Sequence, residues 1–130
     1  MKKVYSVLAG ILIAGILFAS PLWAGSDTIT ATFTAATTNG TLLTCASTKY
    51  LKIYSIEAVV TGGGSSVGYV HTEGTRSTTN TLTRVALSSN LPLVKYFADK
   101  ITEKGIGLQV DLSAITALST VVFTIEYQEF

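Results

Sequence analysis

The sequence has few of the residues on which most catalytic and metal sites are built. It contains one cysteine, one histidine and one tryptophan, and only 13% of its 130 residues are charged. One cysteine cannot form a disulfide within a chain, and one cysteine with one histidine is too few for a zinc site of the usual composition. The nine basic and eight acidic residues nearly balance, which leaves no basic surface for nucleic acid. We therefore predict no cofactor, no metal site and no nucleic-acid partner.

The first 24 residues have the layout of a bacterial secretory signal peptide. Two lysines precede an apolar run over residues 4–19, and Pro21 and Ala24 follow it. This order predicts export and cleavage after Ala24. The alternative is a retained anchor, because the run is only slightly shorter than the roughly 17–25 residues that span a bilayer. We expect cleavage, a mature domain of residues 25–130 with no stable membrane insertion, and a secreted, extracellular or cell-surface location.

The mature part is rich in hydroxyl residues and in alternating patterns. Residues 25–130 contain 20 Thr and 10 Ser, and the β-branched threonine favours pleated sheet. Apolar and polar residues alternate with a period of two over residues 28–35, 106–112 and 121–128, which is typical of half-buried strands. Weaker patterns predict further strands at residues 41–46, 50–61, 67–73, 81–87 and 93–97. This spacing predicts a single all-β domain, an antiparallel β-sandwich of about seven or eight strands with a jelly-roll-like order.

Local features refine this prediction. The apolar phase shifts within residues 50–61, which predicts a β-bulge near Ser55. The dipeptide Asn39-Gly40 and the glycine run at residues 62–64 predict hairpin turns. Two segments also fit a short helix or a helical turn: residues 90–101 and 113–118.

Two residues with reactive side chains require an interpretation. His71 lies two residues from Glu73 on a predicted strand, and a histidine oriented by a carboxylate can act as a general base. No Gly-x-Ser-x-Gly pattern supplies a nucleophile, so we predict a solvated histidine on a sheet face and no enzymatic activity. Cys45 lies in an apolar segment, which predicts burial. The alternative is an exposed thiol that bridges two subunits in an oxidising compartment.

The segment 25–36 forms a complete strand at the predicted start of the mature chain. Its alternating apolar and threonine faces hold the predicted assembly residues Thr28, Ile29, Ala31, Phe33 and Ala35. An extended terminal strand can complete the sheet of a neighbouring subunit. The layout of signal peptide, donor-like strand and β body resembles that of secreted pilus-type fibre subunits, which polymerise by strand donation. The alternative is that Asn39-Gly40 folds the segment back onto residues 41–46 of the same chain.

These features predict a structural role. We expect a homo-oligomer or homopolymer, in which the chain is a subunit of an extracellular or cell-surface filament, tube or coat held by β-strand pairing between subunits. The alternative is a secreted monomeric module that binds carbohydrate or another surface ligand through exposed aromatic side chains. The predicted ligand face of that module consists of Tyr50, Tyr54, Tyr69, His71 and Glu73.

Overall fold

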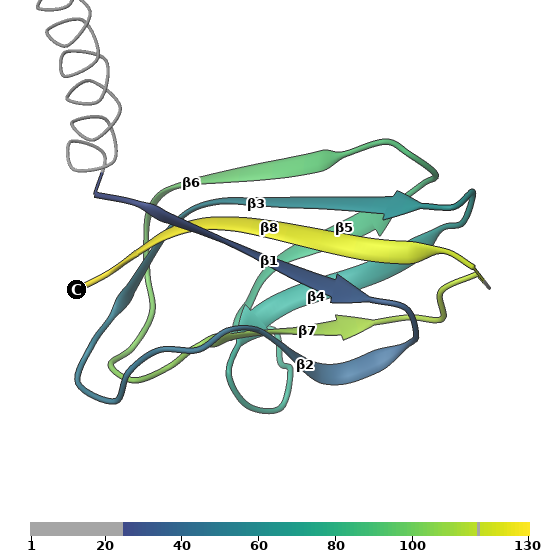
Figure 1. The fold of residues 1–130 in the computed structure, drawn as a ribbon. Helices are drawn as coiled ribbons and strands as arrows, with labels where there is room; N and C mark the ends of the chain where they lie inside the picture. Colours follow the sequence, from purple (N-terminus) through teal and green to yellow (C-terminus); the bar gives the residue numbers. More distant parts are fainter. Residues whose placement is uncertain (1–24, 117) are drawn as a thin grey trace, which may run out of the picture.

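The computed structural model describes residues 25–116 and 118–130, so the predicted signal peptide lies outside the described residues. Eight strands form two four-stranded sheets that pack face to face (Figure 1). The strands are β1 (Asp27–Phe33), β2 (Thr37–Leu43), β3 (Leu51–Thr61), β4 (Ser66–Thr72), β5 (Thr81–Leu87), β6 (Leu93–Ile101), β7 (Leu108–Leu112) and β8 (Thr120–Glu129). A search of the described residues for a helix long and apolar enough to cross a membrane finds none.

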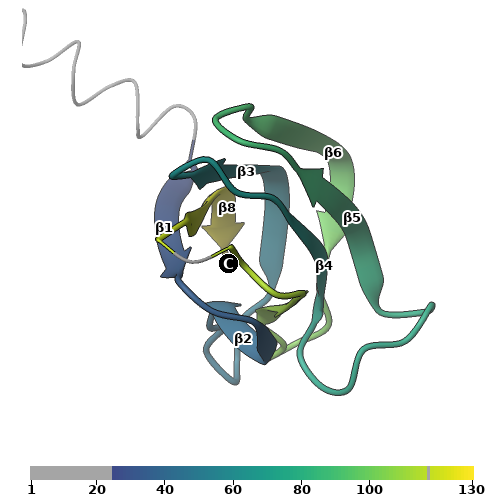
Figure 2. The same ribbon diagram turned by 90° about the vertical axis from the view of Figure 1, so that its right-hand side faces the viewer.

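The order of the strands is that of a jelly roll. Sheet A has the order β1-β8-β3-β6 and sheet B has the order β2-β7-β4-β5, with antiparallel neighbours throughout. Thus β1 pairs with β8, β2 with β7, β3 with β6 and β4 with β5, as in one long hairpin rolled over itself. Figure 2 shows β1 and β2 on one side of the sandwich and β5 and β6 on the other. The predicted all-β antiparallel sandwich is confirmed.

The core lies between the sheets and is built from alternate residues of the central strands. On β8, Val121, Phe123 and Ile125 are buried, while the residues between them are only partly covered. On β7, Leu108 and Val110 face them from the other sheet and are equally buried. Because burying one such side chain contributes about 1.5–3 kcal/mol, these inward rows hold the two sheets together.

The predicted bulge in the longest strand is confirmed. The register of β3 shifts between Ile53 and Ser55 relative to both of its neighbours, β6 and β8. Ile53 and Ile56 are three residues apart and would point to opposite faces of a regular strand. The bulge brings both of them into the core, where each is fully buried.

Both predicted hairpin turns are wrong, because neither site connects two strands that pair with each other. Asn39-Gly40 lies inside β2, which pairs with β7 and not with β1. A Cβ on Gly40 would lie 2.8 Å from Cε1 of Phe33, so glycine is needed there for packing. The glycine run 62–64 connects β3 of sheet A to β4 of sheet B, with Gly62 at a φ of 87°. The left-handed conformation favours glycine.

The helical alternatives also fail. The segment 90–101 contains the nine-residue strand β6, whose backbone hydrogen bonds are made with β3. The described residues of the segment 113–118 contain no helix. Pairing with a long neighbouring strand outweighs a weak local helix signal in the first case, since β propensity and helix propensity are both small compared with tertiary contacts.

Candidate functional site

Four strands form the edges of the two sheets. β1 and β6 are the edges of sheet A, and β2 and β5 are the edges of sheet B. Within the described residues each of them pairs with one neighbouring strand only. Its other side presents backbone N–H and C=O groups to which a further strand can bind. The edges of the sandwich are therefore the first candidate sites of interaction.

β6 is the edge that exposes the largest apolar side chains. Tyr96 is 77% exposed, and Val94 and Ile101 are exposed as well. Lys95 and Asp99 lie between them and are also exposed. The sequence predicted a strand over only part of β6, residues 93–97. The regular spacing of charged residues within an apolar strand is the signal from which an edge strand could have been predicted.

β1 holds the predicted assembly residues, and it pairs with β8 of the same chain. Ile29, Ala31 and Phe33 pack against the core, and the ring of Phe33 meets that of Phe123 edge to face, with 6.1 Å between ring centroids. Thr28 is exposed on the outer face, and Ala35 lies beyond the end of the strand. In this arrangement β1 completes its own sheet, so donation to a neighbour would require β1 to leave β8.

The predicted ligand face is divided between the two sheets. Tyr54 lies on β3 of sheet A, and Tyr50 directly precedes that strand. Tyr69 and His71 lie on β4 of sheet B, and Glu73 follows that strand. Tyr54 donates a hydrogen bond to Oε1 of Gln128, at 2.9 Å. The five residues therefore do not form one binding surface.

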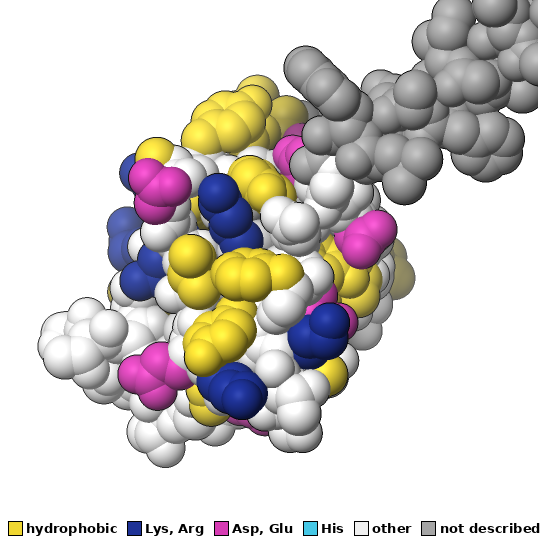
Figure 3. Space-filling view, turned by 90° about the vertical axis from the view of Figure 1, so that its left-hand side faces the viewer, with side chains coloured by type: hydrophobic (Ala, Val, Ile, Leu, Met, Phe, Trp, Pro, Cys, Tyr) yellow, Lys and Arg dark blue, Asp and Glu magenta, His cyan; other side chains and the backbone are white. Residues whose placement is uncertain are grey.

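An aromatic pair lies at the end of sheet A where β3 begins and β8 ends. The rings of Tyr50 and Phe130 are stacked with 5.8 Å between centroids, and the two residues exchange two backbone hydrogen bonds. Tyr50 is 39% exposed and Phe130 is 48% exposed. Figure 3 shows hydrophobic side chains gathered on this end of the molecule among charged ones. Such a surface can pack against a flat apolar partner.

A polar cluster covers the outer face of sheet B. The guanidinium of Arg76, from the loop after β4, lies 4.2 Å from the ring centroid of Tyr69, and its Nε donates to Oδ2 of Asp111 at 3.0 Å. His71 lies beneath this loop and is fully buried, so the prediction of a solvated histidine is wrong. Its Nδ1 is 2.8 Å from the carbonyl of Thr72, and its Nε2 is 3.4 Å from Oδ1 of Asp111. Both of these oxygens are acceptors, so an N–H of the His71 ring can donate a hydrogen bond to either of them.

The hydrogen bonds of this cluster set the charge of Asp111. Burial alone would raise the pKa of its carboxyl group, but the backbone N–H of Asn39, at 2.8 Å, and the side chains of Arg76 and His71 outweigh that effect. The pKa of Asp111 is therefore lowered from its ordinary value. The ionised carboxylate joins β2, β4 and the loop after β4 to β7. The sequence did not reveal this cluster, because the partners of Asp111 are distant along the chain.

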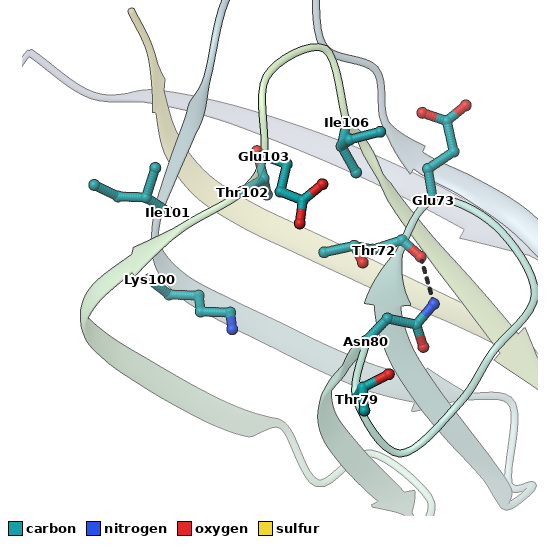
Figure 4. A pocket seen from close by; sticks show the side chains of 9 residues that line it. All are labelled: Thr72, Glu73, Thr79, Asn80, Lys100, Ile101, Thr102, Glu103 and Ile106. Atoms are coloured by element: carbon teal, nitrogen blue, oxygen red, sulfur yellow. Dashed lines mark hydrogen bonds between the residues drawn. The ribbon is translucent and has the colours of Figure 1, made fainter.

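The loop end of the sandwich contains a polar pocket of about 350 Å³. Lys100 and Glu103 extend from the end of β6 and the loop after it, opposite Asn80, which donates a hydrogen bond to the Thr72 carbonyl (Figure 4). Glu73 also lines this pocket, although its side chain points away from Asn80 in Figure 4, and its carboxylate accepts a hydrogen bond from the backbone N–H of Gly107. Glu73 is thus the one predicted ligand residue that lines this pocket.

Cys45 lies beside a second, smaller pocket and is half-buried, which is intermediate between the two predicted states. Its Sγ is 3.3 Å from the carbonyl of Lys49. Burial raises the pKa of the thiol, with a contribution from the nearby carboxylates of Glu129 and Glu73, despite a backbone hydrogen bond at Gly105. The raised pKa disfavours the nucleophilic thiolate.

The fold and its edges define an eight-stranded jelly-roll domain with an exposed, partly apolar edge strand. No protein family model matches the sequence, and no curated protein matches it. The chain is similar in structure to a chain of the acidic stable capsid of Helicobacter pylori bacteriophage KHP30, with a TM-score of 0.57 and 14% identity over 78% of this chain and 86% of that chain. Identity at this level shows a shared fold alone.

A second likeness is with Bacillus endospore appendages, described as a novel family of disulfide-linked pili. Here the TM-score is 0.44, with 15% identity over 79% of this chain and 86% of that chain.

Proposed function

We propose that this chain is a structural subunit that associates with copies of itself in an extracellular or cell-surface assembly. The observation that carries the proposal is β6, a nine-residue edge strand that exposes Val94, Tyr96 and Ile101. A long edge strand with apolar side chains binds other strands unless something blocks it. Its backbone can extend a neighbour's sheet, and its side chains can be buried in the contact.

The low charge of the chain and its fold support this role. Only 13% of residues are charged, so self-association meets little electrostatic repulsion. The structural likeness to a chain of a bacteriophage capsid is with a protein that forms an assembly. Jelly rolls occur in coats and in ligand-binding domains alike, so the exposed edge is the stronger argument for assembly. The extracellular or cell-surface location rests on the predicted signal peptide.

A second candidate function is a binding module, and the aromatic pair favours it. Tyr50 and Phe130 present a partly exposed stack, and sugar rings pack against such surfaces. The polar pocket lined by Lys100, Glu103 and Asn80 offers hydrogen-bonding groups at the same loop end. The two candidates make opposite predictions for the mass of the protein in solution.

The test uses protein produced from the full 130-residue sequence in an exporting bacterial host. We expect light scattering after size-exclusion chromatography to show a mass that rises with protein concentration, and electron micrographs to show assemblies of repeating subunits. A monomeric mass at every concentration would contradict the proposal. In that case, binding to a panel of polysaccharides that is lost in Tyr50→Ala and kept in Tyr96→Ala would support the binding module.

A further inference from the structure

We propose that one end of the sandwich, which we call the uncharged end, binds the same end of a second copy of this chain about a two-fold axis. The uncharged end consists of the connections at residues 34–36, 62–65 and 88–92, together with residues 113–116 and 118–119. Figure 1 shows these connections at the end of the sandwich opposite the C-terminus. The inference rests on the proposed self-association and adds a second contact to the one at β6.

The uncharged end contains no charged residue, as its sequence shows. The connections at the opposite end, which are residues 44–50, 73–80 and 102–107, contain five charged residues. Charged side chains are regularly exposed on protein surfaces, and they are depleted at the core of protein–protein interfaces. The composition of the uncharged end therefore fits a surface that a partner protein covers.

Leu118 and Ser119 lie in environments opposite to those expected of an apolar and a polar residue. Leu118 is 99% exposed, whereas Ser119 is buried and its Oγ has no hydrogen-bond partner among the described residues. Leu118 also has a φ of 64°, a left-handed conformation that is unfavourable for a residue with a side chain. Because local arrangements that oppose stability are concentrated at functional sites, we infer that the exposure of Leu118 serves a contact.

The backbone of the domain fixes the two exposed leucines of the uncharged end in place. A Cβ on Gly62 would lie 2.5 Å from the carbonyl oxygen of Leu118, so the connections that hold these two residues are in direct contact. Leu91 is 64% exposed, and the N–H of the preceding Asn90 donates a hydrogen bond to the carbonyl of Val60 at 2.8 Å. A contact between parts that are already ordered loses little conformational entropy.

The distribution of charge selects the same end of a second copy as the partner. If the uncharged end covered the opposite end of a neighbour, the exposed Lys49, Glu103 and Lys104 would lose water without gaining an opposite charge. Two uncharged ends desolvate no ion when they meet, and two-fold contacts of this kind are the commonest in soluble oligomers. A lipid bilayer fits less well, because its hydrocarbon offers no hydrogen bonds to the hydroxyl groups of these connections.

The contact is isolated in a Tyr96→Asp background, which places a charge in the proposed β6 contact. We expect sedimentation equilibrium of this variant, produced from the full 130-residue sequence in an exporting host, to show monomers and dimers only. Adding Leu118→Asp places a carboxylate in the contact on both copies. We expect it to raise the dissociation constant at least about tenfold, which corresponds to about 1.4 kcal/mol. The matched control is Thr78→Asp at an exposed position of the opposite end, which is expected to leave the dissociation constant unchanged.

Leu118→Gly separates a role in the contact from a role in the fold. Glycine adopts a positive φ without steric cost, so we expect the midpoint of thermal unfolding, followed by circular dichroism, not to fall. The dissociation constant is expected to rise as it does with Leu118→Asp, because the apolar side chain is lost in both variants.

The outcomes distinguish this contact from the proposed function. If Tyr96→Asp is monomeric while the wild type associates, or if both Leu118 variants dimerise as well as their background, the end-to-end contact is wrong and the proposed assembly role stands. Oligomers of Tyr96→Asp larger than two chains would contradict the two-fold contact as well. Binding of monomeric Tyr96→Asp to phosphatidylcholine vesicles, abolished by Leu118→Asp, would assign the uncharged end to a lipid surface and overturn the inference. A wild type that is monomeric at every concentration would contradict the proposed function itself.

Discussion

At the scale of single residues, Asp111 links several segments of the fold, which the sequence around it does not indicate. Its carboxylate accepts hydrogen bonds from the backbone of Asn39 and from the side chain of Arg76, and it lies 3.4 Å from the ring of His71. These groups come from β2, from the loop after β4 and from β4 itself. Hydrogen bonds to an ionised carboxylate are stronger than those between neutral groups, so this one side chain stabilises the packing of several segments.

The lowered pKa of Asp111 predicts a loss of stability in acid. Because the pKa is lower in the folded state, the ionised carboxylate stabilises the fold. This contribution is fully present above the unfolded-state pKa of about 3.9, and it is lost as the pH falls through the folded-state pKa. We expect Asp111→Asn to lower the free energy of unfolding by urea at neutral pH and to reduce its change across that acid range.

The control for this experiment is Glu103→Gln, which removes an exposed carboxylate and is expected to leave the acid dependence unchanged. Parallel pH profiles of the wild type and the Asp111 variant would contradict the role assigned to Asp111.

At the scale of elements, the two edges of sheet A differ in what they bury. The apolar face of β1 packs onto the core, and Phe33 lies against both Phe123 and Gly40. The outer face of β6 instead carries Val94 and Tyr96, which are 39% and 77% exposed. β1 is thus packed into its own domain, while β6 retains exposed apolar surface.

The pairing of β1 with its own β8 predicts the product of a disulfide cross-link. Thr30 lies directly opposite Thr124 in the register of the two strands. In a Cys45→Ser background, the double variant T30C/T124C is expected to run as an oxidised monomer on a non-reducing gel, even when it is taken from assemblies. The single variant Thr30→Cys in the same background is the control.

A ladder of covalent oligomers in the double variant would instead show that β1 is exchanged between subunits. That result would restore the donor-strand arrangement, in which Ile29 and Phe33 fill the neighbour's core.

Most strands were predictable from the sequence because alternation has the same period as the pleat. The bulge near Ser55 was predictable for the same reason, since a phase shift in the apolar pattern must be absorbed by the backbone. The turns were less predictable: Asn39-Gly40 has the composition of a hairpin turn, yet it lies inside a strand. A local dipeptide carries no information about which sheet the next strand joins.

At the scale of the whole molecule, the jelly roll combines a closed core with open edges. The core is shared by both sheets, and in the described chain each edge strand pairs with one neighbouring strand only. This combination would suit the proposed role as a subunit, because a shared core can stabilise the domain while its edge strands can extend the sheets. Extension of the sheets requires that the chain reach its location in a form in which nothing covers the edge strands.

Export with removal of residues 1–24 is expected to produce that form. We expect mass spectrometry of the exported protein to give a chain that begins at Gly25, because Ala24 supplies the small residue that precedes a signal cleavage site. Replacing Ala24 with Arg is expected to block cleavage and to leave the protein in the membrane fraction. A wild-type protein of full-length mass in that fraction would favour the retained anchor.

The sequence by itself determined the strands, the all-β class and the sandwich, because side-chain alternation is a local consequence of backbone geometry. Only the tertiary structure decided that β1 pairs with β8, that His71 is buried, and that Asp111 meets Arg76. The last pair is separated by 35 residues and the histidine contact by 40. Such contacts depend on the order of strands across a sheet, which is set by the packing of the complete core and by no single segment of the chain.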